Sequence, residues 1–350
     1  MIAKFKKDNE NLRRKVDIPM KVLTVIIPSY NTEKYIDECL PTLLKGGTDD
    51  VEILLVNDGS SDNTLQKIRK YESKYSNIIR VIDKENGGHG SVINVGITEA
   101  RGKYFKVIDG DDWVDPNTFS RLIKDLRNTD VDLVLNSYIT HNVINNRDKI
   151  IRQKGIRPSK EFLFDDIANR IGYLALHGIT YKTSIFRDNK IKMQENCFYE
   201  DAEYDIYPVI HIQSMIYYDY PVYVYRIGSL TQSVNSSNVV KNKKMLNTIV
   251  NNLVNFFSNI PDDISHEKNE YIKKQISDVI KNMYGVYLKM PIGEEAFNEM
   301  HNFDQWLKSH SDILYASTNT LSVRMLRLNF YSLYVVGCKL FELMRKKRGF

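Results

Sequence analysis

The chain has 350 residues, of which 42% are hydrophobic and 27% are charged. These values are typical of a folded globular protein and exclude disorder on the scale of a domain. The net charge of +5, from 49 basic and 44 acidic side chains, is too small to indicate a nucleic-acid partner.

Cysteine usage and apolar patterning indicate a compartment. Cys39, Cys197 and Cys338 lie far apart and form no CxxC pair, so we expect no disulfide framework or zinc site and a reducing, cytoplasmic location. Residues 1–15 are charged and lack the apolar core of a signal peptide. No apolar run approaches the roughly 18 residues that a transmembrane helix needs.

The first third of the chain alternates short apolar strands with helices. We predict strands at 23–28, 51–56, 78–82 and 104–108, and the helices that follow them end near 44, 75, 100 and 127. This alternation predicts a Rossmann-like α/β fold, with a mostly parallel sheet and helices on both faces.

The rhythm changes after Pro116. A strand is predicted at 133–138, then a mixed region with a hairpin up to about 226, including a helix from Tyr199 to about Gln213. From about 238 the apolar spacing is helical. We therefore divide the chain into a polar lead-in at 1–21, an α/β domain at 22–235 and a helical extension at 236–350.

Acidic residues follow two of the predicted strands. Asp58 follows the second strand, and Asp109 and Asp111 follow the fourth, at the sheet edge where open α/β sheets bind ligands. The run from Asp109 to Asp112 places three carboxylates within four residues, which repel unless a cation lies among them. Carboxylates suit Mg²⁺ or Mn²⁺. The alternative is an acidic surface turn in which Asp112 or Asp115 caps the next helix.

Three further segments have two interpretations each. The loop from Asn86 to Gly90 resembles a phosphate-binding turn, but polar residues 83–86 separate it from its strand, unlike a dinucleotide fingerprint. Glu200 and Asp201 could supply a general base, or could be first-turn acids that the helix dipole favours. Arg226 could hold a diphosphate, or lie solvated at a strand end.

Five segments in order resemble the family 2 glycosyltransferases, which have the GT-A fold. They are VIIPSYN, VNDGSSDNT, ENGGHGSVINVGI, GKYFKVIDGDDW and YEDAEYD, within residues 22–231. The resemblance implies an inverting enzyme that moves a sugar from a nucleoside diphosphate sugar, UDP-hexose or UDP-N-acetylhexosamine, to an acceptor hydroxyl. The acceptor would be a growing surface glycan, lipid-linked or protein-linked. Residues 22–115 would bind the nucleotide sugar, and 116–235 the acceptor.

The resemblance also implies roles for individual residues. The implied nucleotide-sugar contacts are Pro28, Tyr30, Glu33, Asp58, Asn86, Gly88, Asp109, Gly110 and Arg226. Asp111 and Asp109 would hold Mn²⁺ or Mg²⁺. Asp201 would be the catalytic base, and Glu200 would orient it or bind the acceptor.

The chain departs from the family at one position. The family often has Ala-Arg-Asn at the start of the third helix, where this chain has Val92-Ile93-Asn94. Ile93 thus replaces an arginine that would contact phosphate or ribose. His89 and Lys84 are the two candidates for taking over that role.

The last segment, from Leu321 to Phe350, mixes apolar and basic residues and includes the cluster Arg345 to Arg348. It could be an interfacial helix on an anionic membrane, which would put the protein on the inner face of the cell membrane. The alternative is a helix packed on the catalytic domain or on a second subunit of a homo-oligomer.

Two other functions are weaker interpretations. A sugar-phosphate nucleotidyltransferase would need a phosphate loop rich in glycine and basic residues near the first strand, and VIIPSYNTEKY has none. An inactive carbohydrate- or membrane-binding adaptor would not need the acidic set Asp58, Asp109, Asp111 and Asp201.

Overall fold

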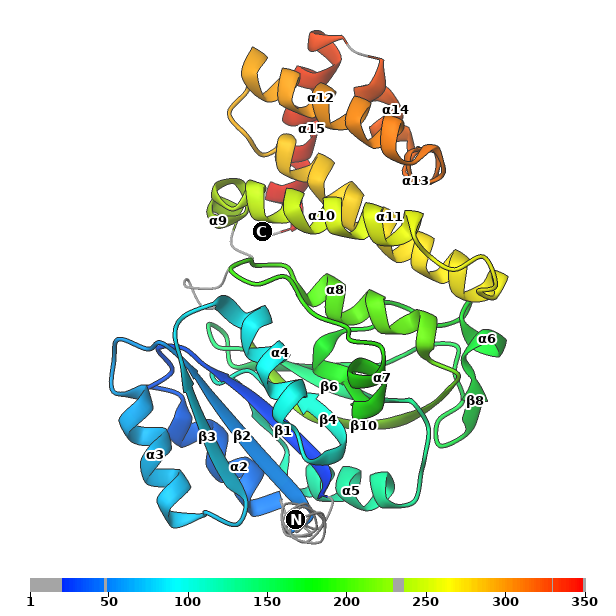
Figure 1. The fold of residues 1–350 in the computed structure, drawn as a ribbon. Helices are drawn as coiled ribbons and strands as arrows, with labels where there is room; N and C mark the ends of the chain where they lie inside the picture. Colours follow the sequence, from blue (N-terminus) through cyan, green and yellow to red (C-terminus); the bar gives the residue numbers. More distant parts are fainter. Residues whose placement is uncertain (1–20, 47–48, 229–235, 329, 349–350) are drawn as a thin grey trace, which may run out of the picture.

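The computed structural model describes residues 21–46, 49–228, 236–328 and 330–348, so the predicted lead-in lies outside the described residues except for Lys21. Figure 1 shows a layered α/β body with a stack of helices on one side of it. The strands are β1 (Lys21–Ser29), β2 (Val51–Asp58), β3 (Ile79–Lys84), β4 (Gly102–Val107), β5 (Trp113–Val114), β6 (Leu133–Asn142), β7 (Arg147–Ile151), β8 (Glu161–Leu163), β9 (Ile179–Lys182) and β10 (Ser214–Ile227).

Helices cover both faces of the sheet. In the α/β body they are α2 (Ile36–Gly46), α3 (Thr64–Lys74), α4 (Gly88–Glu99), α5 (Pro116–Arg127), α6 (Phe164–Ile167), α7 (Thr183–Asp188) and α8 (Asp201–Ile206), with 3₁₀ turns at Leu176–Gly178 and Tyr207–His211. The C-terminal stack contains α9 (Ser236–Lys241), α10 (Lys243–Ser258), α11 (His266–Tyr287), α12 (Glu294–His310), α13 (Asp312–Ser317), α14 (Leu321–Arg327) and α15 (Tyr331–Arg348).

The strands form a single mixed sheet in the order β3-β2-β1-β4-β9-β6-β10-β5, with β7 beside β6 and β8 beside β10. β1 pairs in parallel with β2 and β4, and β2 pairs in parallel with β3. β9 runs antiparallel between β4 and β6 and joins the two parallel parts of the sheet. The carboxyl ends of β1, β2 and β4 therefore meet at one edge, as the sequence predicts.

The two-residue alternation of each strand decides which helices cover which face. Val25 and Ile53 belong to the buried cluster that includes residues of α2, α3 and α5. Ile26 and Leu54, one residue later, belong to the cluster that includes residues of α4. Because successive side chains point to opposite faces, near-continuous apolar strands are required here. The predicted α/β fold with a C-terminal helical extension is confirmed.

Two local predictions have different outcomes in the second half of the sheet. The hairpin is confirmed, because β6 and β7 pair antiparallel. The prediction of one α-helix to about Gln213 is wrong: α8 ends at Ile206, and residues 207–211 form a 3₁₀ turn. Pro208 lies in that turn, and its missing N–H and its ring are incompatible with continuing the α-helix.

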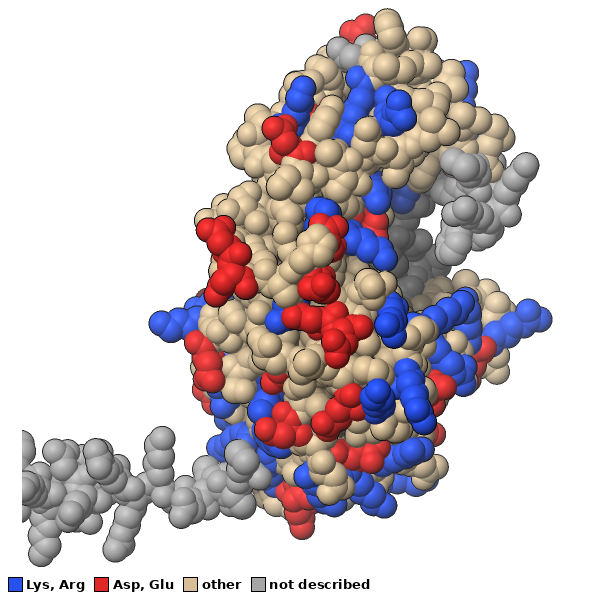
Figure 2. Space-filling model, turned by 90° about the vertical axis from the view of Figure 1, so that its right-hand side faces the viewer, with Lys and Arg blue, Asp and Glu red and all other residues tan. Residues whose placement is uncertain are grey.

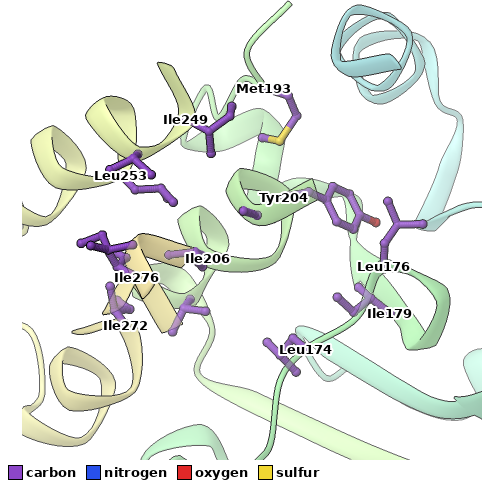
Figure 3. Packing of buried hydrophobic residues seen from close by; sticks show 14 of the residues in the cluster. Leu174, Leu176, Ile179, Met193, Tyr204, Ile206, Ile249, Leu253, Ile272 and Ile276 are labelled. Carbon is purple, nitrogen blue, oxygen red and sulfur yellow. The ribbon is translucent and has the colours of Figure 1, made fainter. Parts of the chain in front are cut away.

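The C-terminal helices share a core with the α/β body. Ile249 and Leu253 of α10 and Ile276 of α11 belong to the same buried cluster as Ile206 of α8, and Figure 3 shows these side chains directed toward one another. The core is therefore continuous across residue 235. On the face in Figure 2, acidic and basic side chains mix over the α/β body, while uncharged side chains predominate over the helices. No helix within the described ranges combines the length and apolarity that crossing a bilayer requires.

Candidate active site

A cavity of about 710 Å³ opens where β1, β2 and β4 end. Its walls come from the loops that follow these strands, the start of α4, the 3₁₀ turn at Leu176–Gly178, the segment 196–201, β10 and α10. The lining residues are Pro28, Ser29, Tyr30, Asn31, Thr32, Tyr35, Asp58, Asn86, Gly88, His89, Val92, Asp109, Gly110, Asp111, Leu176, His177, Asn196, Cys197, Phe198, Tyr199, Glu200, Asp201, Tyr225 and Met245.

Ten of the twelve residues to which the resemblance assigns a role in the site line this cavity together. They are Pro28, Tyr30, Asp58, Asn86, Gly88, Asp109, Gly110, Asp111, Glu200 and Asp201. Glu33 and Arg226 are not among the lining residues. The Glu33 carboxylate instead accepts hydrogen bonds from the backbone and side-chain nitrogens of Asn63, at 3.0 and 2.9 Å.

Asp58 is buried at the end of β2, where three donors surround its carboxylate. Lys84 Nζ lies 2.6 Å from Oδ1, and the backbone nitrogens of Gly87 and Gly88 donate at 2.9 and 2.8 Å. Gly88 has a φ of +80°, a conformation that favours glycine. The glycine-rich loop thus presents its N–H groups to Asp58, so the loop and the strand end form one unit.

The acidic turn after β4 packs tightly against the end of β1. A Cβ on Gly110 would lie 2.7 Å from the carbonyl oxygen of Pro28, so the turn requires glycine. Asp112 is buried and accepts hydrogen bonds from the Tyr223 hydroxyl at 2.6 Å and the Arg226 backbone N–H at 2.7 Å. Asp115 caps α5 by accepting from Thr118 N at 2.8 Å. The helix-capping alternative is therefore correct for Asp115.

Arg226 holds this turn from outside the cavity. Its Nε donates to the backbone oxygen of Asp111 at 2.8 Å, and its guanidinium pairs with Glu38. The guanidinium carbon lies 5.1 and 4.8 Å from the ring centroids of Tyr35 and Trp113. The side chain is therefore not solvated, and these contacts fix the shape of the acidic turn.

His89 joins two acidic segments that are remote in sequence. Its Nδ1 lies 2.6 Å from a Glu200 oxygen, and its Nε2 lies 2.9 Å from an Asp109 oxygen. Burial lowers the pKa of His89, but the two carboxylate hydrogen bonds outweigh burial and raise it well above its ordinary value. For Asp109, burial acts in the opposite direction and raises the pKa. The hydrogen bond from His89 outweighs burial and holds the pKa of Asp109 below its ordinary value.

Asp201 begins α8 and faces the cavity. Desolvation by the cavity walls, reinforced by the neighbouring Glu200 carboxylate, raises the pKa of Asp201 to about 6. Tyr199, two residues earlier, has a φ of +74°, which is strained for a bulky side chain. Such a pKa suits a general base that must exchange a proton near neutral pH.

Three side chains can serve as ligands for a divalent cation. Ligand atoms of Asp109, Asp112 and His177 lie within 4.8 Å of one another. His177 Nδ1 is buried and has no hydrogen-bond partner among the described residues. Burial lowers the pKa of His177 to about 4, so the ring is neutral, the form that binds metals. Asp111 lines the same cavity, where burial and then the Asp109 charge raise its pKa. This donor set fits Mn²⁺ or Mg²⁺.

Sequence reasoning considered His177 only as a lone histidine, more often structural than functional, and did not single out Tyr225 or Met245; all three line the cavity. No motif marks them, because each approaches from a different element. Ile93, at the family's arginine position, is fully buried in the core, so nothing at that position reaches the cavity. Of its two candidate replacements, Lys84 binds Asp58 and His89 bridges Asp109 and Glu200.

Comparisons with known proteins agree with this geometry. Over 113 residues the chain is 40% identical to the uncharacterized glycosyltransferase EpsJ of Bacillus subtilis, covering 32% of this chain and 33% of EpsJ. Over 187 residues it is 28% identical to the poly(ribitol-phosphate) beta-N-acetylglucosaminyltransferase TarS of Staphylococcus aureus, covering 50% of this chain and 30% of TarS. The chain thus spans about a third of these relatives' lengths.

The fold has a solved counterpart. Residues 1–349 of S. aureus TarS, in complex with UDP-GlcNAc, superpose with a TM-score of 0.67 at 19% identity, covering 94% of this chain and 92% of that one. At this identity the similarity establishes the fold. Residues 24–192 match the family described as glycosyl transferase family 2. Residues 24–192 therefore form a glycosyl transferase family 2 domain with the GT-A fold, as the motifs of this chain indicate.

Proposed function

We propose that the chain is a glycosyltransferase that transfers a sugar from a nucleoside diphosphate sugar to an acceptor hydroxyl of a surface glycan, glycolipid or glycoprotein. The observation that carries this proposal is the gathering of Asp58, Asp109, Asp111 and Asp201 in one cavity at the carboxyl edge of the sheet. The complex of TarS with UDP-GlcNAc supports a UDP-N-acetylhexosamine as the first donor to test, with UDP-hexoses second.

The proposed reaction is a single displacement. The acceptor oxygen forms a bond to the anomeric carbon while the bond from that carbon to the diphosphate oxygen breaks. The nucleoside diphosphate leaves with the bonding electron pair, and Asp201 takes the acceptor proton. An α-linked donor would then give a β-linked product. A side chain of pKa about 6 is deprotonated at neutral pH, which supports Asp201 as this base.

Within the cavity, Asp58 and the loop from Asn86 to Gly88 would contact the nucleoside. Asp109, Asp112 and His177, with Asp111 in the same cavity, would supply the ligands for Mn²⁺ or Mg²⁺, and the buried, unpartnered Nδ1 of His177 is the feature that favours a metal. When bound, the metal would neutralise negative charge on the departing diphosphate. Arg226 would keep the acidic turn in shape through the Asp111 carbonyl.

The test is release of nucleotide from a panel of nucleotide sugars, measured with Mn²⁺ and with EDTA. We expect metal-dependent release from one donor, and loss of release in Asp111→Ala. Asp278→Ala on α11, an exposed aspartate outside the cavity, is the matched control and should behave as wild type. No release from any donor, together with no nucleotide binding by calorimetry, would contradict the proposal and favour an inactive adaptor.

We also propose a peripheral position on an anionic membrane. Val336, Leu340 and Leu343 are 45%, 50% and 57% exposed and follow one another at helical spacing along α15. The segment 321–350 has seven basic residues and one acidic residue. The side chains of the basic cluster Arg345 to Arg348 lie outside the described ones. An apolar stripe beside basic residues supports binding to anionic lipid.

Flotation with phosphatidylglycerol vesicles tests this position. Binding should exceed that to phosphatidylcholine vesicles and fall when Val336, Leu340 and Leu343 are all changed to serine. Equal binding to both lipids would contradict the proposal. Failure to float, with a concentration-dependent dimer in sedimentation that the serine variant abolishes, would instead assign the stripe to a homo-oligomer.

A further inference from the structure

The histidine of the glycine-rich loop connects two acidic motifs across the cavity. His89 lies in the first turn of α4, Asp109 follows β4, and Glu200 immediately precedes α8. Both ring nitrogens lie within hydrogen-bond distance of a carboxylate oxygen, at 2.6 Å from Glu200 and 2.9 Å from Asp109. Carboxylate oxygens only accept, so both nitrogens donate and the ring contributes one positive charge between two negative ones.

The glycines on either side of His89 make this bridge sterically feasible. The Gly88 backbone, at φ +80°, lets α4 begin close to residue 196, and a Cβ there would lie 3.3 Å from the Asn196 backbone. A Cβ on Gly90 would collide with the Gln194 carbonyl oxygen. Asn196 N also donates to Gly87 O at 2.7 Å. The start of α4 is thus fastened to the segment that leads into Glu200 and Asp201.

We propose that His89 is a positioning residue of the transfer reaction: it holds Glu200, and through it the adjacent Asp201, at a fixed place relative to Asp109. This inference rests on the proposed function and assigns the glycine-rich loop a role beyond nucleotide contact. Ile93, at the position of the family's usual arginine, is buried in the core and brings no charge to the cavity, whereas His89 lines it.

Removing the imidazole has a specific physical consequence. The Glu200 side chain is only 5% exposed, so it would become a buried carboxylate without its donor, next to Asp201 and with no cation between it and Asp109. Repulsion would then shift the start of α8, where the proposed base lies. Asp58 and its three donors do not depend on His89, so nucleotide binding should persist.

A double-mutant cycle tests this coupling, with His89→Ala, Glu200→Gln and the combined variant. We expect each single change to lower kcat by about 10- to 100-fold, as for other residues that orient reacting groups. The KM for the donor should stay within about threefold of wild type. Since His89 acts through Glu200, the combined variant should be no slower than the slower single variant. The proposal would be overturned if the fold-losses of kcat in the two single variants multiplied in the combined variant. It would also be overturned if the variants changed only the donor KM.

Chemical rescue separates positioning from a general structural role. Added imidazole should restore part of the kcat of His89→Ala and none of the kcat of Asp201→Asn. If His89→Ala does not fold, as judged by its urea midpoint, His89→Gln replaces it in the cycle. His301→Ala on α12 is the matched control and should not respond to imidazole. A folded His89→Ala that imidazole fails to activate would contradict the proposal.

The proposed function can fail independently of this inference. If wild type neither transfers sugar nor releases nucleotide, the transferase proposal fails. If wild type is active and the cycle is additive, only the role of His89 fails.

Discussion

The α/β body and the C-terminal helices share one buried core but contribute unequally to the cavity. All of the lining residues except Met245 come from residues 28–225, and more than half lie in loops, either after a strand or before α8. The helices supply packing, with Ile249 and Leu253 set against the body. The difference teaches that the chemistry resides in short, motif-bearing loops, while the helices complete one wall and hold α8 in place.

The largest effect should come from the body, at Asp201. Asp201→Asn is nearly isosteric but cannot accept a proton, so kcat should fall by about 10²- to 10⁴-fold. Nucleotide affinity measured by calorimetry should change little. An active Asp201→Asn would move the base role to another carboxylate of the cavity. Glu203→Gln, two residues further along α8, is the matched control for changing an acid in this helix.

Stability measurements examine whether the two regions are one unit. Leu253 is fully buried on α10, so Leu253→Ala should cost about 2–5 kcal/mol of unfolding free energy. The chain has two tryptophans, Trp113 in the body and Trp306 on α12. In variants that keep only one tryptophan, Leu253→Ala should lower the urea midpoint reported by Trp113 and the midpoint reported by Trp306 by the same amount.

A shift at Trp306 alone would contradict the shared core and define the helices as a separately folding domain. Ile292→Ala supplies the control, because this side chain is 47% exposed and its truncation should leave both midpoints nearly unchanged.

The pH dependence follows from the raised pKa of Asp201, about 6. A base must be deprotonated, so kcat should be constant above this pKa and fall about tenfold per pH unit below it. Glu200→Gln removes a neighbouring negative charge, which is one cause of the raised pKa, and should move the inflection to lower pH. If the inflection of the pH profile stays in place in Glu200→Gln, the titration of Asp201 is not its cause.

The smallest effect is expected where the helices meet the cavity. Met245→Ala removes apolar contact from one wall and should raise acceptor KM roughly fivefold, about 1 kcal/mol, without changing donor KM. Met325→Ala on α14 is the control. A change in donor KM alone would assign this wall to the nucleotide sugar.

Sequence reasoning reached the parts of the site that local pattern determines. Asp58, Asp109 and Asp111 follow apolar strands, and the parallel order brings their strand ends together. Contacts between elements could not be predicted. His89, for example, bonds to Asp109, which is 20 positions away in the sequence, and to Glu200, which is 111 positions away. Nor does any local signal show that Arg226 Nε donates to the backbone oxygen of Asp111.

The same limit applies to the second half of the sheet. The hairpin of β6 and β7 follows from alternation and turn residues, but the length of β10, at 14 residues, depends on pairing with β6, β5 and β8. The acids around Asp201 favour a helix start, and the 3₁₀ turn around Pro208 ends the helix early.

A crystal structure with UDP and Mn²⁺ tests the central claim most directly. The account predicts the uracil beside Asp58 and the diphosphate and metal beside Asp109 and Asp111, with His89 still between Asp109 and Glu200. Nucleotide bound outside this cavity, or a cavity filled by the metal and nucleotide with Asp201 turned away from the donor, would contradict it.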